Sequence, residues 1–333
     1  MGAVLLTACQ TVEPEKVEEG GLSINILSNY LTKASTEAQA WESSLNKMRV
    51  LVYNSEGKIY KDELLQSPFT SATIPNVKVG TYSVYAVANN CAGISDVSTL
   101  SSLNASTVKL DDCSKTTSTG FVMFGGKLDV SVTAGTTPTP VTVDVVRFPA
   151  RVKLVSVKNE LPASLGALTV DNVMLINGYS SWQLGASGSP SGAMNPAGRK
   201  DGTGAVVTSS TADFAQYSFM DVPSGDQTLA NGSAAKAYGY YFYSFPNTVT
   251  TDKTGSKVTG GKARLVVHAT IGGQGYYYPV TIDKLERNKC YEVVLIISGY
   301  GSDDPNDPVR KGSLSVTVNV KDWENGADYT ETI

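Results

Sequence analysis

LSINILSNYLTK, residues 22–33, is a short amphipathic stretch near the start of the chain. Its apolar residues Leu22, Ile24 and Ile26 alternate with polar ones, and this period of two predicts a strand with one face in a core. The stretch ends at the basic residue Lys33, which is followed by the small residues Ala34, Ser35 and Thr36. It is therefore either an ordinary edge strand or a strand that proteolysis could remove, leaving a groove edged with unpaired backbone groups.

Composition places the chain among all-β proteins. Charged residues make up only 17% of the 333 residues, whereas 31 glycines and 17 tyrosines suit strands and the turns between them. The length allows two domains, each with its own core. The net charge of -4, without a basic stripe in the sequence, argues against nucleic acid as a partner, because phosphate binding needs clustered Lys and Arg.

The first nine residues, MGAVLLTAC, are similar to the end of a secretory signal. Their last four residues resemble the bacterial lipobox, in which lipid is attached to the cysteine, here Cys9. Residues 10–33 then form a polar lead segment that ends in the removable strand. We expect export as an outer-membrane lipoprotein; a chance match is the alternative, because no positively charged segment precedes the apolar run.

Three further cysteines follow. Cys91 and Cys113 lie in turn-like surroundings, NNCAG and DDCSK, and an exported chain meets an oxidising compartment, so a disulfide between them is one possibility and two free thiols are the other. Cys290 directly precedes an apolar run, which predicts a partly buried, inert thiol.

Short apolar runs between Gly, Pro, Asn and Asp predict a β-sandwich in each half of the chain. We expect strands over residues 47–54, 58–60, 69–74, 81–88, 107–110, 121–124, 127–133, 141–157, 168–176, 237–245, 262–271, 276–282, 290–298 and 313–320. Short helices fit only residues 37–45 and 94–103. The run AGTTPTP, residues 134–140, predicts the boundary between an N-terminal domain, residues 34–139, and a C-terminal domain, residues 140–333, because proline cannot donate to a strand ladder.

An enzyme is the least supported class, and we expect no catalytic residues and no cofactor. The single histidine, His268, lies within an alternating strand and is expected to be structural, with no nucleophile motif beside it. Asp303, Asp304 and Asp307 could hold calcium, but prolines interrupt the run, so a solvated loop without metal is expected.

Tyrosines gather in two strands, at positions 238, 240, 241 and 243 and at positions 276–278. They could form a sugar-stacking surface, which gives a surface glycan-binding lipoprotein as an alternative function. Alternating aromatic residues more often pack across a sandwich.

Together these features resemble the fimbrillins, the two-domain pilins of Bacteroidales surface fimbriae. The likeness rests on the lipobox at Cys9, the step Thr32-Lys33-Ala34, the hairpin MRVLVYNSEG and the run RFPARV. It is most specific in the C-terminal blocks YYPVTID, ERNKCYEVVLIISGYGSDDPNDP and LSVTVNVKDW, which follow in the family's order. The resemblance implies two tandem transthyretin-like β-sandwich domains.

The resemblance also implies assembly by donor-strand exchange. In that mechanism a surface trypsin-like protease cuts between Lys33 and Ala34, and the lipidated first strand leaves. A C-terminal strand of the next subunit then fills the groove. The donor strand would include the following alternating residues: Leu314, Val316, Val318 and Val320. The implied partners are other fimbrial subunits, the protease and, through lipid on Cys9, the outer membrane.

Two features leave an alternative open. The basic residue is Lys33 where arginine is commoner in the family, and the tail after Trp323 has few apolar residues. Without processing, the protein would keep its lipid and serve as a fimbrial anchor, tip or accessory subunit.

Overall fold

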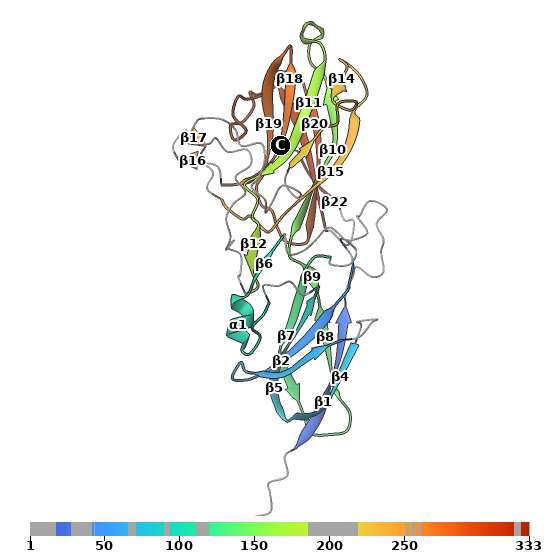
Figure 1. Cartoon of the computed structure of the whole chain (residues 1–333), viewed down its shortest axis with the longest axis vertical. Helices are drawn as coiled ribbons and strands as arrows, with labels where there is room; N and C mark the ends of the chain where they lie inside the picture. The colour runs from blue at the N-terminus through green and yellow to red at the C-terminus, as the bar shows by residue number, and fades with distance from the viewer. Residues whose placement is uncertain are drawn as a thin grey trace, which may run out of the picture.

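Residues 22–27 of the N-terminal stretch lie inside a sheet of the first of two β-domains, which are stacked along the long axis of the molecule (Figure 1). This computed structural model describes residues 18–27, 42, 44–65, 71–89, 94–110, 120–185, 219–250, 253–254, 257–258, 261–322 and 328–332. None of the helices in these ranges has the length and apolar character that crossing a bilayer requires.

The first domain is a sandwich of two sheets, ordered β4-β1-β8 and β3-β2-β5-β7-β9. Its elements are β1 (Glu19–Leu27), β2 (Met48–Asn54), β3 (Ile59–Leu64), β4 (Ser71–Lys78), β5 (Gly80–Ala88), α1 (Leu100–Ala105), β6 (Thr107–Lys109), β7 (Met123–Val132), β8 (Thr139–Asp144) and β9 (Val146–Arg147). Alternate residues of both sheets face one buried apolar core, as the period-two patterns predicted.

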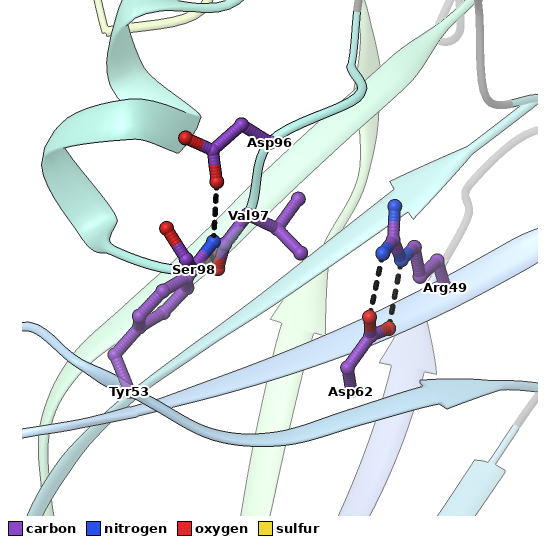
Figure 2. A network of polar contacts seen from close by, with 6 residues as sticks. All are labelled: Arg49, Tyr53, Asp62, Asp96, Val97 and Ser98. Carbon is purple, nitrogen blue, oxygen red and sulfur yellow. Dashed lines mark hydrogen bonds and ion pairs between the residues drawn. The ribbon is translucent and has the colours of Figure 1, made fainter.

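The predicted hairpin KMRVLVYNSEG is confirmed as β2 and β3. Arg49 reaches Asp62 across the hairpin through two hydrogen bonds, from Nε at 2.7 Å and from Nη2 at 2.5 Å (Figure 2). The hydroxyl of Tyr53 donates to the carbonyl of Val97 at 3.0 Å, which ties β2 to the segment before α1. Burial raises the pKa of Tyr53, so its hydroxyl stays protonated as a donor.

The second domain is also a sandwich, with sheets ordered β15-β10-β20-β21-β22 and β13-β11-β18-β19. Its elements are β10 (Ala150–Asn159), η2 (Ala163–Leu165), β11 (Leu168–Ile176), β12 (Ser181–Gln183), β13 (Phe219–Asp221), β14 (Thr228–Leu229), β15 (Lys236–Ser244), β16 (Lys253–Thr254), β17 (Lys257–Val258), β18 (Ala263–Ile271), β19 (Gln274–Ile282), β20 (Lys289–Ile297), β21 (Leu314–Asp322) and β22 (Asp328–Thr332). Aliphatic residues of both sheets fill its core. The all-β, two-domain prediction is confirmed.

Strand pairing moves the domain boundary. β8 pairs with β1 and β9 pairs with β7, so residues 139–147 belong to the first domain and not to the second, where we had placed residues from 140 onward. Pro140 is tolerated in β8 because β8 is the edge strand of its sheet and has free positions on its outer side. The chain crosses to the second domain at Pro149, just before β10.

A third apolar cluster joins the two domains. It combines Tyr53 and Phe121 of the first domain with Trp182 and Tyr243 of the second, all buried. β6 of the first domain pairs antiparallel with β12 of the second, and this two-stranded ladder crosses the junction. The shared core and ladder indicate that the two domains form one stiff unit, because separating them would expose the cluster to water.

Candidate functional site

β1 is the central strand of its sheet. It pairs antiparallel with β4 from Glu19 to Asn25 and parallel with β8 from Leu22 to Leu27, so both of its edges are occupied. Its apolar face is at most 4% exposed and lies in the first-domain core. The expectation of an ordinary edge strand is therefore wrong. The predicted strand over residues 22–31 is confirmed as far as Leu27, and the rest of it lies outside the described residues.

Two neighbouring strands depend on β1. Among the described strands, β4 and β8 each have β1 as their one ladder partner. Removing β1 would leave both unpaired and would expose the core residues Ile74 and Val141 that they carry. It would also withdraw three buried aliphatic side chains, each of which stabilises the fold by about 1.5–3 kcal/mol. A strand that takes its place must run antiparallel to β4 and parallel to β8.

The first residues of β1 are closely surrounded. The ladder with β4 is irregular between Gly20 and Gly21, and a Cβ atom on Gly20 would lie 2.2 Å from the backbone oxygen of Thr133. The carbonyl of Glu19 accepts a hydrogen bond from the backbone NH of Gly135 at 3.1 Å. The connection between β7 and β8 thus packs directly against the backbone at the start of β1, which requires glycine there.

Glu42 is buried in a polar network at the domain junction. Its carboxylate accepts hydrogen bonds from Arg151 Nη1 at 2.7 Å and from the hydroxyl of Tyr243, and its backbone carbonyl accepts from Arg147 Nε at 2.7 Å. Burial, with Glu42 alongside, raises the pKa of Tyr243 well above its ordinary value, so the hydroxyl remains a donor. Sequence analysis missed this network, although the run RFPARV that supplies both arginines was singled out.

The network fixes the chain on the far side of the predicted cleavage site. β1 holds the chain up to Leu27, and Glu42 holds it again fifteen residues later. Lys33 and Ala34 lie between these two points, outside the described residues. A cut at Lys33 would therefore separate β1 from a chain that the second domain retains.

The predicted donor residues lie on β21. This strand pairs along all nine of its residues with β20 and is flanked on its other edge by β22. Val318 is buried, whereas Leu314, Val316 and Val320 are half-buried against the second-domain core. The apolar residues recur every second position, as they do in β1. β22 is the outer strand of this sheet and pairs only with β21 among the described strands.

Of the predicted cysteine sites, the structure describes one. Cys9, Cys91 and Cys113 lie outside the described residues, so lipidation and the disulfide stay predictions. Cys290 is free and 2% exposed, and Arg151 Nε donates to its Sγ atom at 3.1 Å. Burial raises the pKa of the Cys290 thiol and outweighs Arg151, which lowers it. The predicted inert thiol is thus more deeply buried than expected.

His268 has a structural environment. Its Nδ1 atom lies 3.0 Å from Asp171 Oδ2, and its ring lies 4.7 Å from that of Tyr277. The hydroxyl of Thr270 donates to the same carboxylate at 2.9 Å. Burial lowers the pKa of His268, and Asp171 only partly offsets this effect. Within the described ranges, no three His, Cys, Asp or Glu residues converge as metal ligands would.

These features define a class: an all-β protein of two joined sandwiches whose first domain is completed by the N-terminal strand. Residues 22–164, from β1 through the whole first domain to η2, match the family model of the major fimbrial subunit protein (FimA). This match confirms the predicted resemblance to fimbrillins.

Solved structures of Bacteroidales proteins share this fold. A candidate cell adhesion protein of Bacteroides eggerthii has a TM-score of 0.62 and 22% identity over 92% of this chain and 97% of its own. A fimbrilin (FimA) of Porphyromonas gingivalis has a TM-score of 0.61 and 14% identity over 92% and 98%. The tip fimbrial protein Mfa3 of the same species, with a C-terminal truncation, has a TM-score of 0.54 and 14% identity over 92% and 99%.

Proposed function

We propose that this protein is a structural subunit of a cell-surface fimbrium that polymerises by donor-strand exchange. The supporting observation is the position of β1, which is the sole described ladder partner of both β4 and β8 and yet comes from the N-terminal lead segment. Once β1 is gone, main-chain hydrogen bonds to β4 and β8 would give an incoming strand its affinity, and alternate apolar side chains would fix its register.

The donor strand is proposed to come from the C-terminal region of a second copy. β21 offers apolar residues at alternate positions, which match the spacing of Leu22, Ile24 and Ile26. To act as the donor, β21 must leave β20 and also separate from β22. Departure of β22 breaks only its one ladder with β21. We therefore propose that β22 detaches first and that β21 follows when a groove is offered.

Export and processing complete the proposal. Lipid on Cys9 would hold the precursor at the outer membrane, and a trypsin-like surface protease would cut between Lys33 and Ala34. The segment between β1 and Glu42 suits this step, because both of its ends are anchored and the cut leaves the second domain intact.

Limited trypsin treatment of the purified precursor tests polymerisation. We expect ladders of oligomers on size-exclusion chromatography and in SDS gels without boiling, and we expect none from the Lys33→Gln variant. A matched control, Lys61→Gln on the exposed strand β3, should polymerise like the unmodified protein. The proposal fails if the chain loses residues 1–33 and stays monomeric.

Mass spectrometry of the cell-surface form separates the shaft subunit from the alternatives. A mature chain that begins at Ala34 supports the polymerising subunit. A lipidated chain that begins at Cys9 supports an anchor, tip or accessory subunit. That outcome would contradict the proposed cleavage at Lys33 but would still agree with a role as a fimbrial subunit.

A further inference from the structure

The connection between β20 and β21 encloses a hollow on the surface of the second domain. The hollow has a volume of about 360 Å³ on the side of Lys311 and about 630 Å³ on the side of Tyr300, and Pro308 and Arg310 border both parts. The larger part is lined by Tyr276 of β19 and by the connecting loop. Leu314 and Val316 of the proposed donor strand β21 line the smaller part, whereas no residue of β1 or β21 lines the larger part.

Two tyrosine rings form one wall of this larger part. The rings of Tyr276 and Tyr300 lie 5.1 Å apart at an interplanar angle of 36°, and Tyr300 is 47% exposed. Tyr243 and Tyr278 of the two predicted aromatic groups are buried in the core and offer no such surface.

Charged side chains form the other walls. Asp303, Asp307 and Arg310 line the hollow, and within the described part of the chain their side chains make no hydrogen bond or ion pair. Neighbouring Asp304 differs, because it accepts a hydrogen bond from the backbone NH of Asn306 at 2.9 Å and so shapes the loop. The hollow therefore holds two free acceptor groups and one free donor group.

The loop that carries these groups is fixed to the sheet. Tyr277 and Ser302 exchange two backbone hydrogen bonds, at 2.7 and 2.9 Å, and the hydroxyl of Tyr278 donates to the carbonyl of Gly299 at 2.9 Å. Gly301 leaves no room for a side chain, since a Cβ atom there would lie 2.5 Å from the carbonyl oxygen of Tyr277. A preformed site loses less entropy when it binds a ligand.

We propose that this hollow binds a neutral saccharide. A sugar ring has apolar C–H faces that pack on aromatic rings, and its hydroxyl groups both donate and accept hydrogen bonds, which fits two carboxylates and one guanidinium. An anion would be repelled by Asp303 and Asp307, and a purely apolar ligand would leave three charged groups without water. The site would let a subunit hold glycan while β21 is paired with β20.

A microarray of neutral oligosaccharides, probed with the intact uncleaved precursor, tests this proposal. We expect binding to at least one glycan, confirmed in solution by calorimetry with that oligosaccharide. Tyr300→Ala and Asp307→Asn should each weaken it by about tenfold or more, the effect of losing one stacking or charge-assisted contact. Circular dichroism should show both variants folded, because both side chains lie at the surface.

Tyr240→Ala is the matched control. Tyr240 is a half-buried tyrosine on β15 that does not line the hollow, so its removal should leave glycan binding unchanged. The proposal is wrong if no neutral oligosaccharide binds, or if binding survives Tyr300→Ala and Asp307→Asn. The uncleaved precursor is used throughout, so a negative result leaves the strand-exchange proposal standing.

Discussion

Glu42 and Arg151 form a buried ion pair with a distance of 2.7 Å between Nη1 and Oε2. The side chain of Glu42 is fully buried and that of Arg151 is 6% exposed. The pair connects the segment after the proposed cleavage site to β10 of the second domain. After the proposed cleavage, the pair would therefore hold the new N-terminal segment in place.

Replacing Glu42 should be strongly destabilising. Glu42→Gln removes the carboxylate charge that pairs with the buried Arg151 guanidinium, and breaking such a pair costs about 3–5 kcal/mol of unfolding free energy. Urea denaturation followed by tryptophan fluorescence measures the loss. The control is Glu160→Gln, which breaks the exposed Lys158–Glu160 pair and should cost less than about 1 kcal/mol. An equal effect of the two substitutions would contradict the role assigned to Glu42.

Truncating the core face of β1 should loosen the strand. Ile24→Ala removes a side chain that is 1% exposed and should cost about 2–5 kcal/mol, because it leaves a cavity in the first-domain core. Ser23→Ala, on the exposed face of the same strand, should change stability by no more than about 0.5 kcal/mol.

The same pair of variants also tests strand exchange. After limited trypsin cleavage, the Ile24→Ala strand should leave sooner, and its oligomers should form faster than those of Ser23→Ala. Equal rates would show that the departure of β1 does not control assembly.

Stability should fall on mild acidification because of His268. Its folded-state pKa is lowered by burial, so the unfolded chain takes up the proton first as pH falls below about 6.5. The contribution of His268 is therefore present above that pH and is lost as pH falls through the lower, folded-state pKa. His268 is the single histidine of the chain, so His268→Gln should remove this component of the pH dependence, measured by urea midpoints between pH 7.5 and pH 5. If the urea midpoint of His268→Gln still falls with pH as it does in the unmodified protein, the pH dependence comes from groups other than His268.

Cys290 should be unreactive in the folded protein. Its thiol is buried and has a raised pKa, so little thiolate is present to attack a reagent. In a Cys9→Ser, Cys91→Ser, Cys113→Ser background, the only remaining thiol should react with Ellman's reagent in urea and not in buffer. Rapid labelling of the native protein would mean that this part of β20 opens readily.

Local patterns in the sequence predicted most strands but not their partners. The alternation of apolar and polar residues identified β1 and the β2–β3 hairpin, because successive residues of a half-buried strand point alternately to the core and to water. It could not show that β1 is central or that β8 belongs to the first domain, since both facts depend on pairing between distant segments. Pro140 does not mark a domain boundary, because a proline is acceptable on an outer strand such as β8 and is excluded only from a central one.

The polar sites were harder to predict than the strands. Glu42 stands in a segment for which the sequence predicts only a short helix, and its partners Arg151 and Tyr243 lie over a hundred residues away. Tyr276 was noted in its triplet, but its partner Tyr300 comes from a separate loop. Packing alone decides which tyrosines of an aromatic run are covered, so composition could suggest a sugar surface without locating it.

The dependence of β4 and β8 on a single strand has a consequence for the timing of assembly. The proposed cleavage would break one covalent bond but would leave the ladder hydrogen bonds and core contacts of β1 intact. A cleaved subunit should therefore stay folded with β1 still bound. The rate at which β1 dissociates, and not the rate of proteolysis, should set the lifetime of this state. Growth of a filament would then be limited by how fast the donor strand of another subunit replaces β1. Subunits with an empty groove, which are prone to aggregate, would therefore stay rare.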